Sequence, residues 1–413
     1  MRFVFFSFRN FERDGGGSIR MYGILNSLAA NNSNRVVFIS NAKDKNNFHP
    51  NIQHQSINLE VSNKSKKILQ GLTSFLPAPI IFLVYSKLLK KVKTSIDAIR
   101  EKDEPVYFFE YLDNTIGYLL NAKDQKYAYI NDIHGISTIE FKYQYQNATK
   151  IINKTLFYFK YIASYLLDKK VFSNANGFIY ASDSMKEYYQ SLYKGLDLKR
   201  HCVLPYLLGD VSARNSLNSH LGQELKKRYK INEKDFILFF AGGYKPTAGV
   251  EDLILAFDRL YRKHQNLKMI LIGEGPNKEQ CLNLIKEKQI GDRIILINRV
   301  PYQDLPTYQN IANVVVCPDK QNPYSELIVH LKYFDSLSSG KIVINGGFKS
   351  VKEINKNEFL ALNFIPSDVN SLTQVIEHSI TNYEVLIDKF KSTQKYTLEN
   401  LTYASLINRL YTL

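Results

Sequence analysis

Residues 236–249 read FILFFAGGYKPTAG, an apolar run that breaks into a turn rich in glycine. The apolar run is typical of a strand buried on both faces, and residues 250–263 continue with the periodicity of an amphipathic helix. Another apolar run, Leu267–Ile272, follows and ends in the turn GEG (273–275). Strand, glycine-rich turn, helix and strand in this order predict a βαβ unit of a parallel sheet.

The same alternation extends over the rest of the chain in both directions. Further predicted strands are Arg2–Ser7, Arg35–Ile39, Val106–Phe109, Tyr127–Ile130, Gly177–Tyr180, Arg293–Ile297, Val314–Cys317 and Lys341–Ile344. Predicted helices between and after them include Ser18–Ala30, Lys150–Asp168, Asn277–Lys288, Asp304–Ile311, Leu327–Leu337 and Leu398–Leu410.

A chain of 413 residues is too long for one ordinary domain. We therefore predict the α/β fold class, with two Rossmann-like, doubly wound parallel-sheet domains that face a central cleft. The first domain would comprise residues 1–205 and the second residues 206–395, with the end of the chain, 396–413, crossing back to the first. Ligands of such sheets bind where the carboxyl ends of the strands meet.

The composition limits the environment and the partners of the chain. Three cysteines without metal or redox spacing are expected to be small buried hydrophobes in a reducing compartment. No stretch approaches the length of a membrane span, so we expect a cytoplasmic protein. The formal net charge of +15 indicates an anionic partner, but no nucleic-acid motif is present and no nucleic acid is expected.

Two basic segments, residues 63–93 and 150–170, interleave lysines with apolar and aromatic residues. Such segments suit the surface of an anionic membrane, on which the protein would be peripheral. The alternative is that they form core helices with solvated lysine faces.

Two glycine-rich turns, Gly15–Gly17 and the one beginning at Gly242, separate a predicted strand from a predicted helix. Glycine permits close approach of the backbone, and the helix amino terminus behind it attracts phosphate. Neither turn has the spacing of a Walker loop or of a dinucleotide fingerprint, so a purely structural role is equally open.

A set of motifs in fixed order resembles the retaining glycosyltransferases of the GT-B fold, close to family 4. The set consists of GVEDL (249–253), LIGEGP (271–276), RVPYQDLPTYQNIANVVVCPD (299–319) and LKYFDSLSSGKIVIN (331–345). In the first half, GGGSIRMYGILNSLA (15–29) and INDIHG (130–135) are similar to the acceptor-side loop and the strand-end histidine of the family.

The resemblance implies transfer of a sugar from a nucleotide-sugar donor to a glycan or lipid-linked glycan, with retention of the anomeric configuration. It implies no cofactor and no required metal, and a role in bacterial surface polysaccharide synthesis. It also implies site residues. Donor-binding positions would be Gly16, Gly17, Gly242, Gly243, Gly275, Lys332 and Asp335, and catalytic positions His134, Lys245, Arg299 and Glu326.

Among these, Asp335 takes the place of the glutamate that holds the donor ribose, Glu326 lies one residue from the place of a second glutamate, and His134 would face the transferred sugar. The chain departs from the family at Gly243 and Ala248, where an arginine and a lysine usually stabilise the leaving diphosphate.

We expect Lys245, Arg299 or Lys332 to substitute for the missing cations. The alternative is a non-catalytic partner or chaperone of another transferase, and a nucleotide-sugar epimerase is a third possibility.

Overall fold

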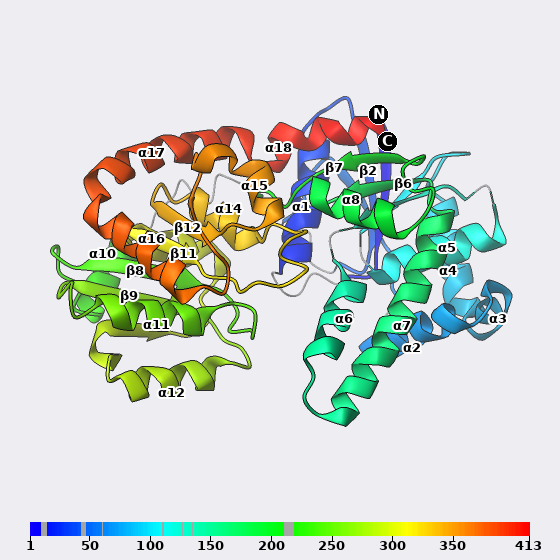
Figure 1. Cartoon of the computed structure of the whole chain (residues 1–413). Helices are drawn as coiled ribbons and strands as arrows, with labels where there is room; N and C mark the ends of the chain where they lie inside the picture. The colour runs from blue at the N-terminus through cyan, green and yellow to red at the C-terminus, as the bar shows by residue number, and fades with distance from the viewer. Residues whose placement is uncertain are drawn as a thin grey trace. The chain divides into compact units, whose positions relative to one another are not determined.

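The computed structural model divides into two compact units, Met1–Pro205 with Tyr403–Leu413 (unit 1) and Tyr206–Thr402 (unit 2). The structure describes residues 1–9, 15–42, 47–59, 61–109, 111–125, 127–133, 135–209 and 219–413. His134, one of the predicted site residues, lies outside these ranges. Each unit is an α/β fold around one parallel sheet (Figure 1).

The sheet of unit 1 has seven parallel strands in the order β3-β2-β1-β4-β5-β6-β7. They are β1 (Arg2–Ser7), β2 (Arg35–Ser40), β3 (Ile52–Ser56), β4 (Val106–Phe108), β5 (Tyr129–Ile133), β6 (Gly177–Tyr180) and β7 (Arg200–Val203). In the five central strands of this sheet, β2, β1, β4, β5 and β6, nearly every residue is buried, as in parallel sheets covered on both faces.

The helices of unit 1 include a long pair that begins after β5. The helices are α1 (Gly16–Ala29), α2 (Asn63–Phe75), α3 (Ala78–Val84), α4 (Ser86–Asp97), α5 (Tyr111–Lys123), α6 (Ser137–Asn147), α7 (Ile151–Asn174) and α8 (Asp183–Leu192). The end of the chain, α18 (Tyr403–Leu406) and the 3-10 helix η4 (Ile407–Thr412), packs against α1.

The sheet of unit 2 has six parallel strands in the order β10-β9-β8-β11-β12-β13. They are β8 (Phe236–Ala241), β9 (Leu267–Ile272), β10 (Ile294–Ile297), β11 (Val314–Cys317), β12 (Ile342–Gly346) and β13 (Leu362–Phe364). The helices are α10 (Ser219–Arg228), α11 (Val250–Leu260), α12 (Lys278–Lys288), α13 (Leu305–Asn310), α14 (Leu331–Leu337), α15 (Lys349–Ile354), α16 (Val369–Thr381) and α17 (Tyr383–Asn400), with 3-10 turns η1 (Gly291–Arg293), η2 (Tyr302–Asp304) and η3 (Lys356–Glu358).

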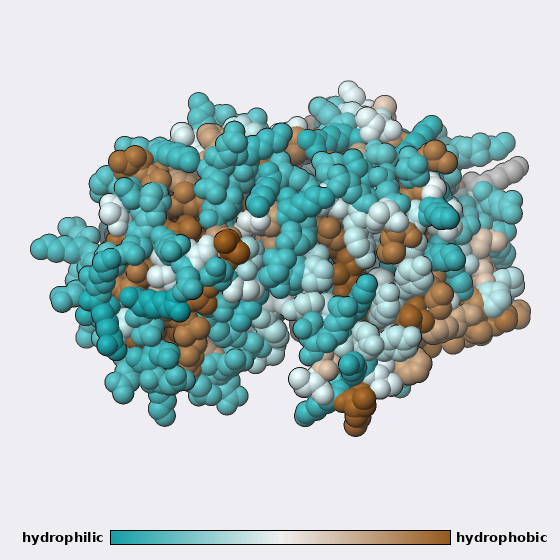
Figure 2. Space-filling model, viewed as in Figure 1, coloured by the Kyte–Doolittle hydropathy of each residue, from teal (hydrophilic) through white to brown (hydrophobic). Residues whose placement is uncertain are grey.

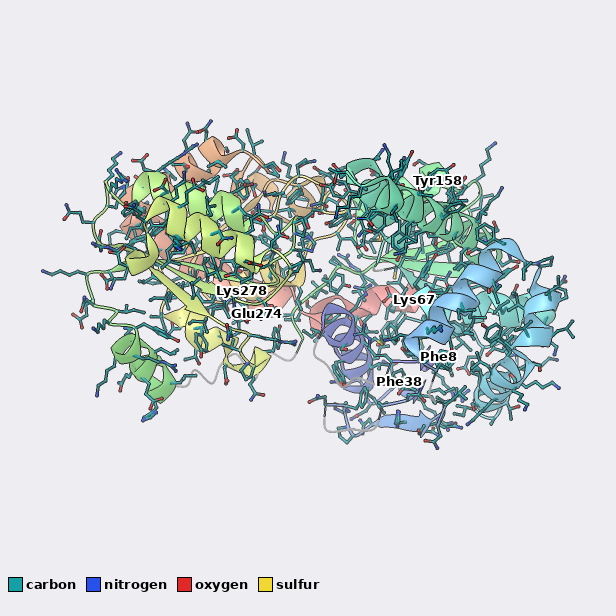
Figure 3. The ribbon with its side chains drawn as sticks, turned by 90° about the horizontal axis from the view of Figure 1, so that it is seen from below. Phe8, Phe38, Lys67, Tyr158, Glu274 and Lys278 are labelled. Atoms are coloured by element: carbon teal, nitrogen blue, oxygen red, sulfur yellow. The ribbon has the colours of Figure 1, made fainter. Side chains whose placement is uncertain are left out.

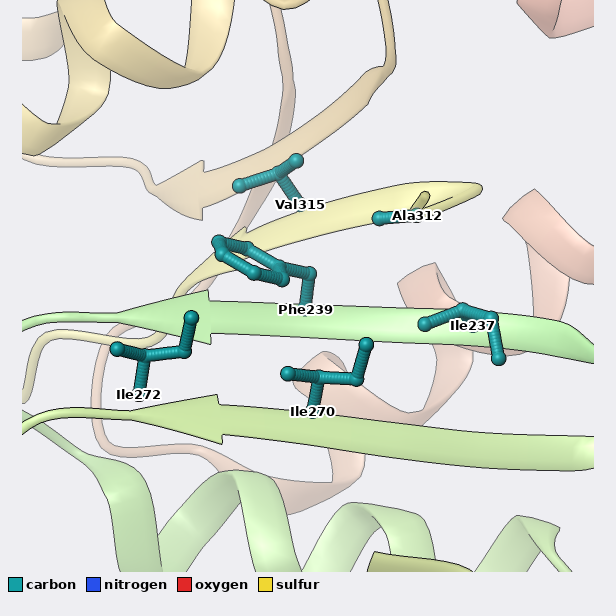
Figure 4. Close-up of a cluster of buried hydrophobic side chains, with 6 residues drawn as sticks. All are labelled: Ile237, Phe239, Ile270, Ile272, Ala312 and Val315. Carbon is teal, nitrogen blue, oxygen red and sulfur yellow. The ribbon is translucent and has the colours of Figure 1, made fainter. Parts of the chain in front are cut away.

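One face of this sheet carries a compact apolar cluster (Figure 4). Its members are Ile237, Phe239, Ile270, Ile272, Ala312 and Val315. Successive side chains of a strand alternate between the faces, so the pairs two residues apart on β8 and β9 point the same way. This packing fixes β8 in the middle of the sheet, and the loops after β8, β9 and β11 therefore meet at one edge.

Two helix predictions are wrong at positions that matter for the site and the chain end. The helix predicted from Leu327 begins only at Leu331, because Asn322 accepts a hydrogen bond from the Ser325 N–H and starts a turn instead. The helix predicted over 398–410 is interrupted after α17, where Thr402 pairs with Leu208 as an isolated β-bridge.

Candidate functional site

Two glycine-containing loops of unit 2, residues 242–249 after β8 and 273–276 after β9, lie backbone against backbone. The Tyr244 N–H donates to the Glu274 carbonyl at 3.0 Å. Gly275 has a φ of +157°, and a Cβ there would lie 2.5 Å from the Tyr244 carbonyl oxygen. Only glycine therefore permits this approach. The carboxylate of Glu274 is held by Lys278 at 2.6 Å. Both residues are labelled in Figure 3.

The loop after β8 also packs tightly against the loop after β11. Gly249 has a φ of +66°, and a Cβ there would lie 1.8 Å from the Pro318 carbonyl oxygen. The Lys320 N–H donates to the Thr247 carbonyl at 2.9 Å. The three loops at this edge are thus held together mainly through their backbones.

The amino terminus of α11 already carries negative charge. Glu251, in its first turn, is buried and accepts a hydrogen bond from the Asn277 amide at 2.8 Å. Lys320 neutralises this end through Asp252 at 3.3 Å and Glu251 at 3.8 Å. Because the helix dipole is compensated by these carboxylates, attraction of a further anion depends on other cations.

The candidates for these cations are Lys245, in the loop after β8, and Lys332, in the first turn of α14. Burial lowers the pKa of His330, Asp319 raises it, and the positive charges of Lys332 and Lys245 also lower it. Lys332 is paired with Asp319 at 2.7 Å and lies 5.4 Å from the centre of the Phe240 ring. Lys245 is exposed, and its ammonium group makes no ion pair with any described residue. Both lysines thus belong to the loop edge of this sheet, and their role as substitute cations stays a prediction.

Arg299, the third substitute, is exposed in the segment after β10. This strand is at the edge of the sheet, two strands away from β8. The role of Arg299 in the site stays a prediction.

Asp335 is buried on α14, with 4% of its surface exposed. The hydroxyl of Tyr302, in η2, donates to its Oδ1 atom at 2.7 Å. The carboxylate has further acceptor sites, so a ribose hydroxyl could share Asp335 with this tyrosine or compete with it for Oδ1. The structure therefore shows Asp335 with a neighbouring donor that a ligand would meet.

Glu326 lies half-buried in the turn before α14 rather than on a helix. Its two carboxylate oxygens accept hydrogen bonds from the Gln321 amide and from the Lys349 N–H, both at 2.7 Å. Lys349 begins α15, so Glu326 fastens the start of this helix to the turn. This is a structural role, and a catalytic one stays a prediction.

In unit 1, the predicted donor positions Gly16 and Gly17 form the start of α1. The guanidinium of Arg9 lies against them: a Cβ on Gly17 would be 3.1 Å from its Nη2 atom, and its Nη1 donates to the Ser18 hydroxyl at 2.6 Å. Sequence reasoning missed Arg9, although an arginine directly between a strand and a glycine run is a signal for an anion-binding turn.

Unit 1 also contains a cavity of about 390 Å³ beyond the carboxyl ends of β4 and β5. Its walls come from α2, α5, α7 and the strand ends, and include Lys66, Lys67, Phe109, Tyr111, Asn114, Asp132 and Asp168. The Oδ1 atom of Asn114 is buried and has no hydrogen-bond partner among the described residues. Amide, carboxyl, aromatic and ammonium groups together suit a polyol that carries an anionic group.

Asp168 is the most unusual group of this cavity, and the sequence reasoning did not single it out. It is buried, and it accepts hydrogen bonds from the hydroxyls of Thr138 and Tyr193. Burial raises the pKa of Asp168 to about 7, although both hydrogen bonds act in the opposite direction. Its carboxyl group can therefore hold or release a proton near neutral pH.

A fully buried ion pair supports the floor of the cavity. Arg20 of α1 donates to both oxygens of Asp132, at 2.7 and 2.8 Å, and the two side chains are 0% and 1% exposed. The same guanidinium donates to the carbonyls of Leu204 and Pro205 at 2.8 and 3.0 Å. Arg20 thus ties the end of β5 to Leu204 and Pro205, where the chain leaves unit 1.

A larger cavity, of about 470 Å³, lies in unit 2 between α13, α14 and α17. It is at the amino ends of β11 and β12, the opposite edge from the glycine loops, and is not part of the candidate site. Among the described residues, no three histidine, cysteine or acidic side chains are grouped so that they could hold a metal ion. No helix of the described residues is long and apolar enough to span a bilayer.

Comparison with known proteins gives a family match for unit 2, which carries the glycine loops. Residues 222–395 match the family described as glycosyl transferases group 1. YtcC of Bacillus subtilis, which has a provisional glycosyltransferase name, is 24% identical over 229 residues. This match covers 54% of the present chain and spans only about half, 53%, of YtcC.

The fold is that of solved GT-B glycosyltransferases over the whole chain. Sucrose-phosphate synthase from Thermosynechococcus elongatus superimposes with a TM-score of 0.71 at 16% identity, covering 99% of this chain and 98% of that one. HepE of Anabaena, solved in complex with UDP, gives 0.69 at 13% identity, with 100% and 98% covered. The chain therefore has the GT-B fold, and its residues 222–395 match the glycosyl transferases group 1 family.

Proposed function

We propose that this protein is a glycosyltransferase that moves a sugar from a nucleotide-sugar donor to a glycan or lipid-linked glycan, with retention of configuration. One observation carries the proposal. Lys245 belongs to the glycine-containing loop after β8, and Lys332 is paired with Asp319 of the loop after β11, so both lysines belong to the edge where ligands of parallel sheets bind, in the unit that matches the glycosyltransferase family. A cationic pair at this edge is what a nucleoside diphosphate requires.

In the proposed reaction, the bond between the anomeric carbon and the donor phosphate breaks, and the diphosphate leaves with the electron pair. Lys245 and Lys332 stabilise the charge that develops on it, together with backbone N–H groups of the glycine loops. The acceptor hydroxyl attacks from the same face and gives its proton to the leaving diphosphate. Asp335 would hold the ribose, beside Tyr302 or in competition with it.

The acceptor would enter from unit 1, whose cavity offers Asn114 and Asp168 to hydroxyl groups and Lys66 and Lys67 to an anionic group. An acceptor of this kind suits bacterial surface polysaccharide synthesis in the cytoplasm, at the anionic inner face of the membrane. Because two lysines neutralise the diphosphate, we propose that the reaction needs no metal and no cofactor. Transfer that persists in excess EDTA would support this point.

A second candidate function is a non-catalytic partner of another transferase. The observation that favours it is that Gly243 and Ala248 replace two cations of the family pattern, while Lys332 is already neutralised by Asp319. In that case only Lys245 would be available to a diphosphate, and turnover would be very slow or absent.

A thermal-shift screen of the whole protein against UDP, GDP, ADP, CMP and their sugar conjugates tests the proposal. A bound nucleotide at about one hundred times its dissociation constant adds about 2.7 kcal/mol of stability. The expected result is a shift with one nucleotide that is lost in Asp335→Ala, followed by transfer from the matching nucleotide-sugar. No shift with any of them would favour the non-catalytic function.

A further inference from the structure

Exposed hydrophobic side chains are concentrated in two helical segments of unit 1. Of the nineteen large hydrophobic side chains that are exposed among the described residues, ten lie in residues 68–84 and 151–159. Figure 2 shows them as hydrophobic areas over α2 and α3 and at the tip of the α6–α7 hairpin. Monomeric proteins rarely leave such patches open without a binding role.

The α6–α7 hairpin is the more exposed of the two regions. Between residues 140 and 163 none of its side chains is buried, so this part of the pair projects from the body of unit 1 (Figure 1). The two helices hold each other through contacts such as Tyr145 with Tyr158, whose ring centres are 5.2 Å apart. At the tip, Ile151 and Ile152 are 75% and 78% exposed. The interior of the hairpin therefore does not need these apolar residues.

The second region is the corner between α2 and α3. Phe75, Leu83 and Val84 are 57%, 80% and 62% exposed. Lys170 of α7 donates to the carbonyls of Thr73, at 2.8 Å, and of Leu76, at 3.0 Å, which ties the end of α2 to α7. The corner and the hairpin are thus parts of one packed group of helices.

The charge of both regions has a single sign. Residues 61–96 contain seven lysines and residues 141–167 contain four, and neither stretch contains an aspartate or glutamate. Apolar side chains among lysines, without any carboxylate, complement a surface that is itself apolar inside and anionic outside. A bilayer with anionic headgroups has this structure, whereas one protein partner would have to combine an apolar face with a surplus of acidic groups.

We propose that the tip of the α6–α7 hairpin and the α2–α3 corner dock the protein on an anionic lipid bilayer. Ile151, Ile152 and Phe159 enter the boundary between headgroups and acyl chains, as do the apolar residues of α3, and the surrounding lysines meet the headgroups. The inference deepens the proposed function, because it would bring a lipid-linked acceptor to the cavity that Lys66 and Lys67 line, both of which lie on α2.

Co-sedimentation of the full chain with phosphatidylcholine vesicles, with and without phosphatidylglycerol, tests the docking surface. The wild type should bind only the anionic vesicles, and less at high salt. The triple variant Ile151→Ser/Ile152→Ser/Phe159→Ser should bind about tenfold more weakly. Lys150→Gln/Lys154→Gln should weaken binding by about fivefold for each lysine. As a matched control, Leu198→Ser/Val385→Ser removes two side chains that are 87% and 77% exposed elsewhere and should leave binding unchanged.

Unchanged vesicle binding by the hairpin variant, with its melting temperature preserved, would overturn the inference. So would wild-type dimers in light scattering that the hairpin variant abolishes while no vesicle binding occurs, since a second copy would then cover the surface. Transfer to a water-soluble acceptor is measured in parallel. Its persistence without vesicle binding would reject the docking surface alone, whereas vesicle binding without nucleotide binding would reject the proposed function alone.

Discussion

The two units share one kind of sheet but present functional groups in different ways. In unit 2 the candidate site is made by loops whose backbones touch at Gly249 and Gly275, with several charged side chains, most of them in ion pairs. In unit 1 the candidate groups are side chains on helices, such as Asp168 of α7 and Asn114 of α5. The family match covers only residues 222–395, so the site built from backbone loops lies in the part of the chain that resembles the family.

Under the proposed function, this difference would separate a common substrate from a variable one. The backbone loops of unit 2 would bind a feature that nucleotide-sugar donors share, the diphosphate, and would tolerate little change. The helix surfaces of unit 1 can exchange side chains without altering the sheet, so they would adapt to one acceptor. We therefore expect substitutions in unit 2 to affect turnover with any acceptor, and those in unit 1 to affect stability, pH dependence and acceptor choice.

The largest effect is expected from Arg20→Ala in unit 1. The substitution leaves Asp132 as a buried carboxylate without its arginine, and loss of one partner of a buried pair costs about 3–5 kcal/mol. Chemical denaturation should show this loss in the free energy of unfolding. Lys391→Ala removes an exposed partner of Asp388 and serves as the control, with almost no expected change. A small loss in Arg20→Ala would mean that unit 1 is not organised around this pair.

The second prediction concerns unit 2. Lys245→Ala should lower kcat by about 10²–10³, because a donor to the developing charge is lost from a preorganised site. The melting temperature should stay unchanged, since Lys245 is exposed and makes no ion pair among the described residues. The exposed Lys286 of α12 offers a control, Lys286→Ala, with normal transfer. Equal activity of the two variants would remove Lys245 from the mechanism.

Much of the fold was predictable, because buried parallel strands are continuous apolar runs. β1, β6, β9 and β11 have the bounds that the sequence predicts. The strand β3, with the sequence IQHQS, was not predicted, since it is an edge strand with little apolar character. The doubly wound α/β fold class is confirmed for both units.

The site was harder to predict, because contacts between distant segments decide it. The contact between the loops after β8 and β11, at Gly249 and Pro318, depends on the two strands being neighbours, which spacing along the chain does not reveal. The hydrogen bond between Tyr302 and Asp335 crosses from η2 to α14. Asp168 seemed one more residue of an amphipathic helix, and only the closed packing around it reveals its raised pKa.

The third prediction uses this raised pKa. Between about pH 4 and 7 the folded protein keeps a proton on Asp168 that the unfolded chain has already released. The folded state therefore binds more protons there, and its stability falls as the pH rises through this range. Asp168→Asn removes the ionisation, so the variant should gain stability over the wild type at pH 8 and lose most of that gain at pH 5.

Melting temperatures of both proteins at the two pH values measure this difference. Asp388→Asn, at an exposed position, should show no comparable change between pH 5 and 8. The same difference at both pH values would show that Asp168 is already ionised at pH 5, and that the unit 1 cavity is more polar than its packing indicates.

The smallest effect is expected at Tyr302 of unit 2, whose hydroxyl would compete with the ribose of a nucleotide for Asp335. Tyr302→Phe removes the hydroxyl that donates to Asp335, so a ribose would no longer have to compete with it. One hydrogen bond is worth about 1 kcal/mol net, and calorimetric titration should show about fivefold tighter nucleotide binding. Tyr396→Phe, on the exposed surface of α17, should bind as the wild type does. Weaker binding by Tyr302→Phe would instead make Tyr302 a ligand contact, and the donor site would then rest on side chains as the unit 1 cavity does.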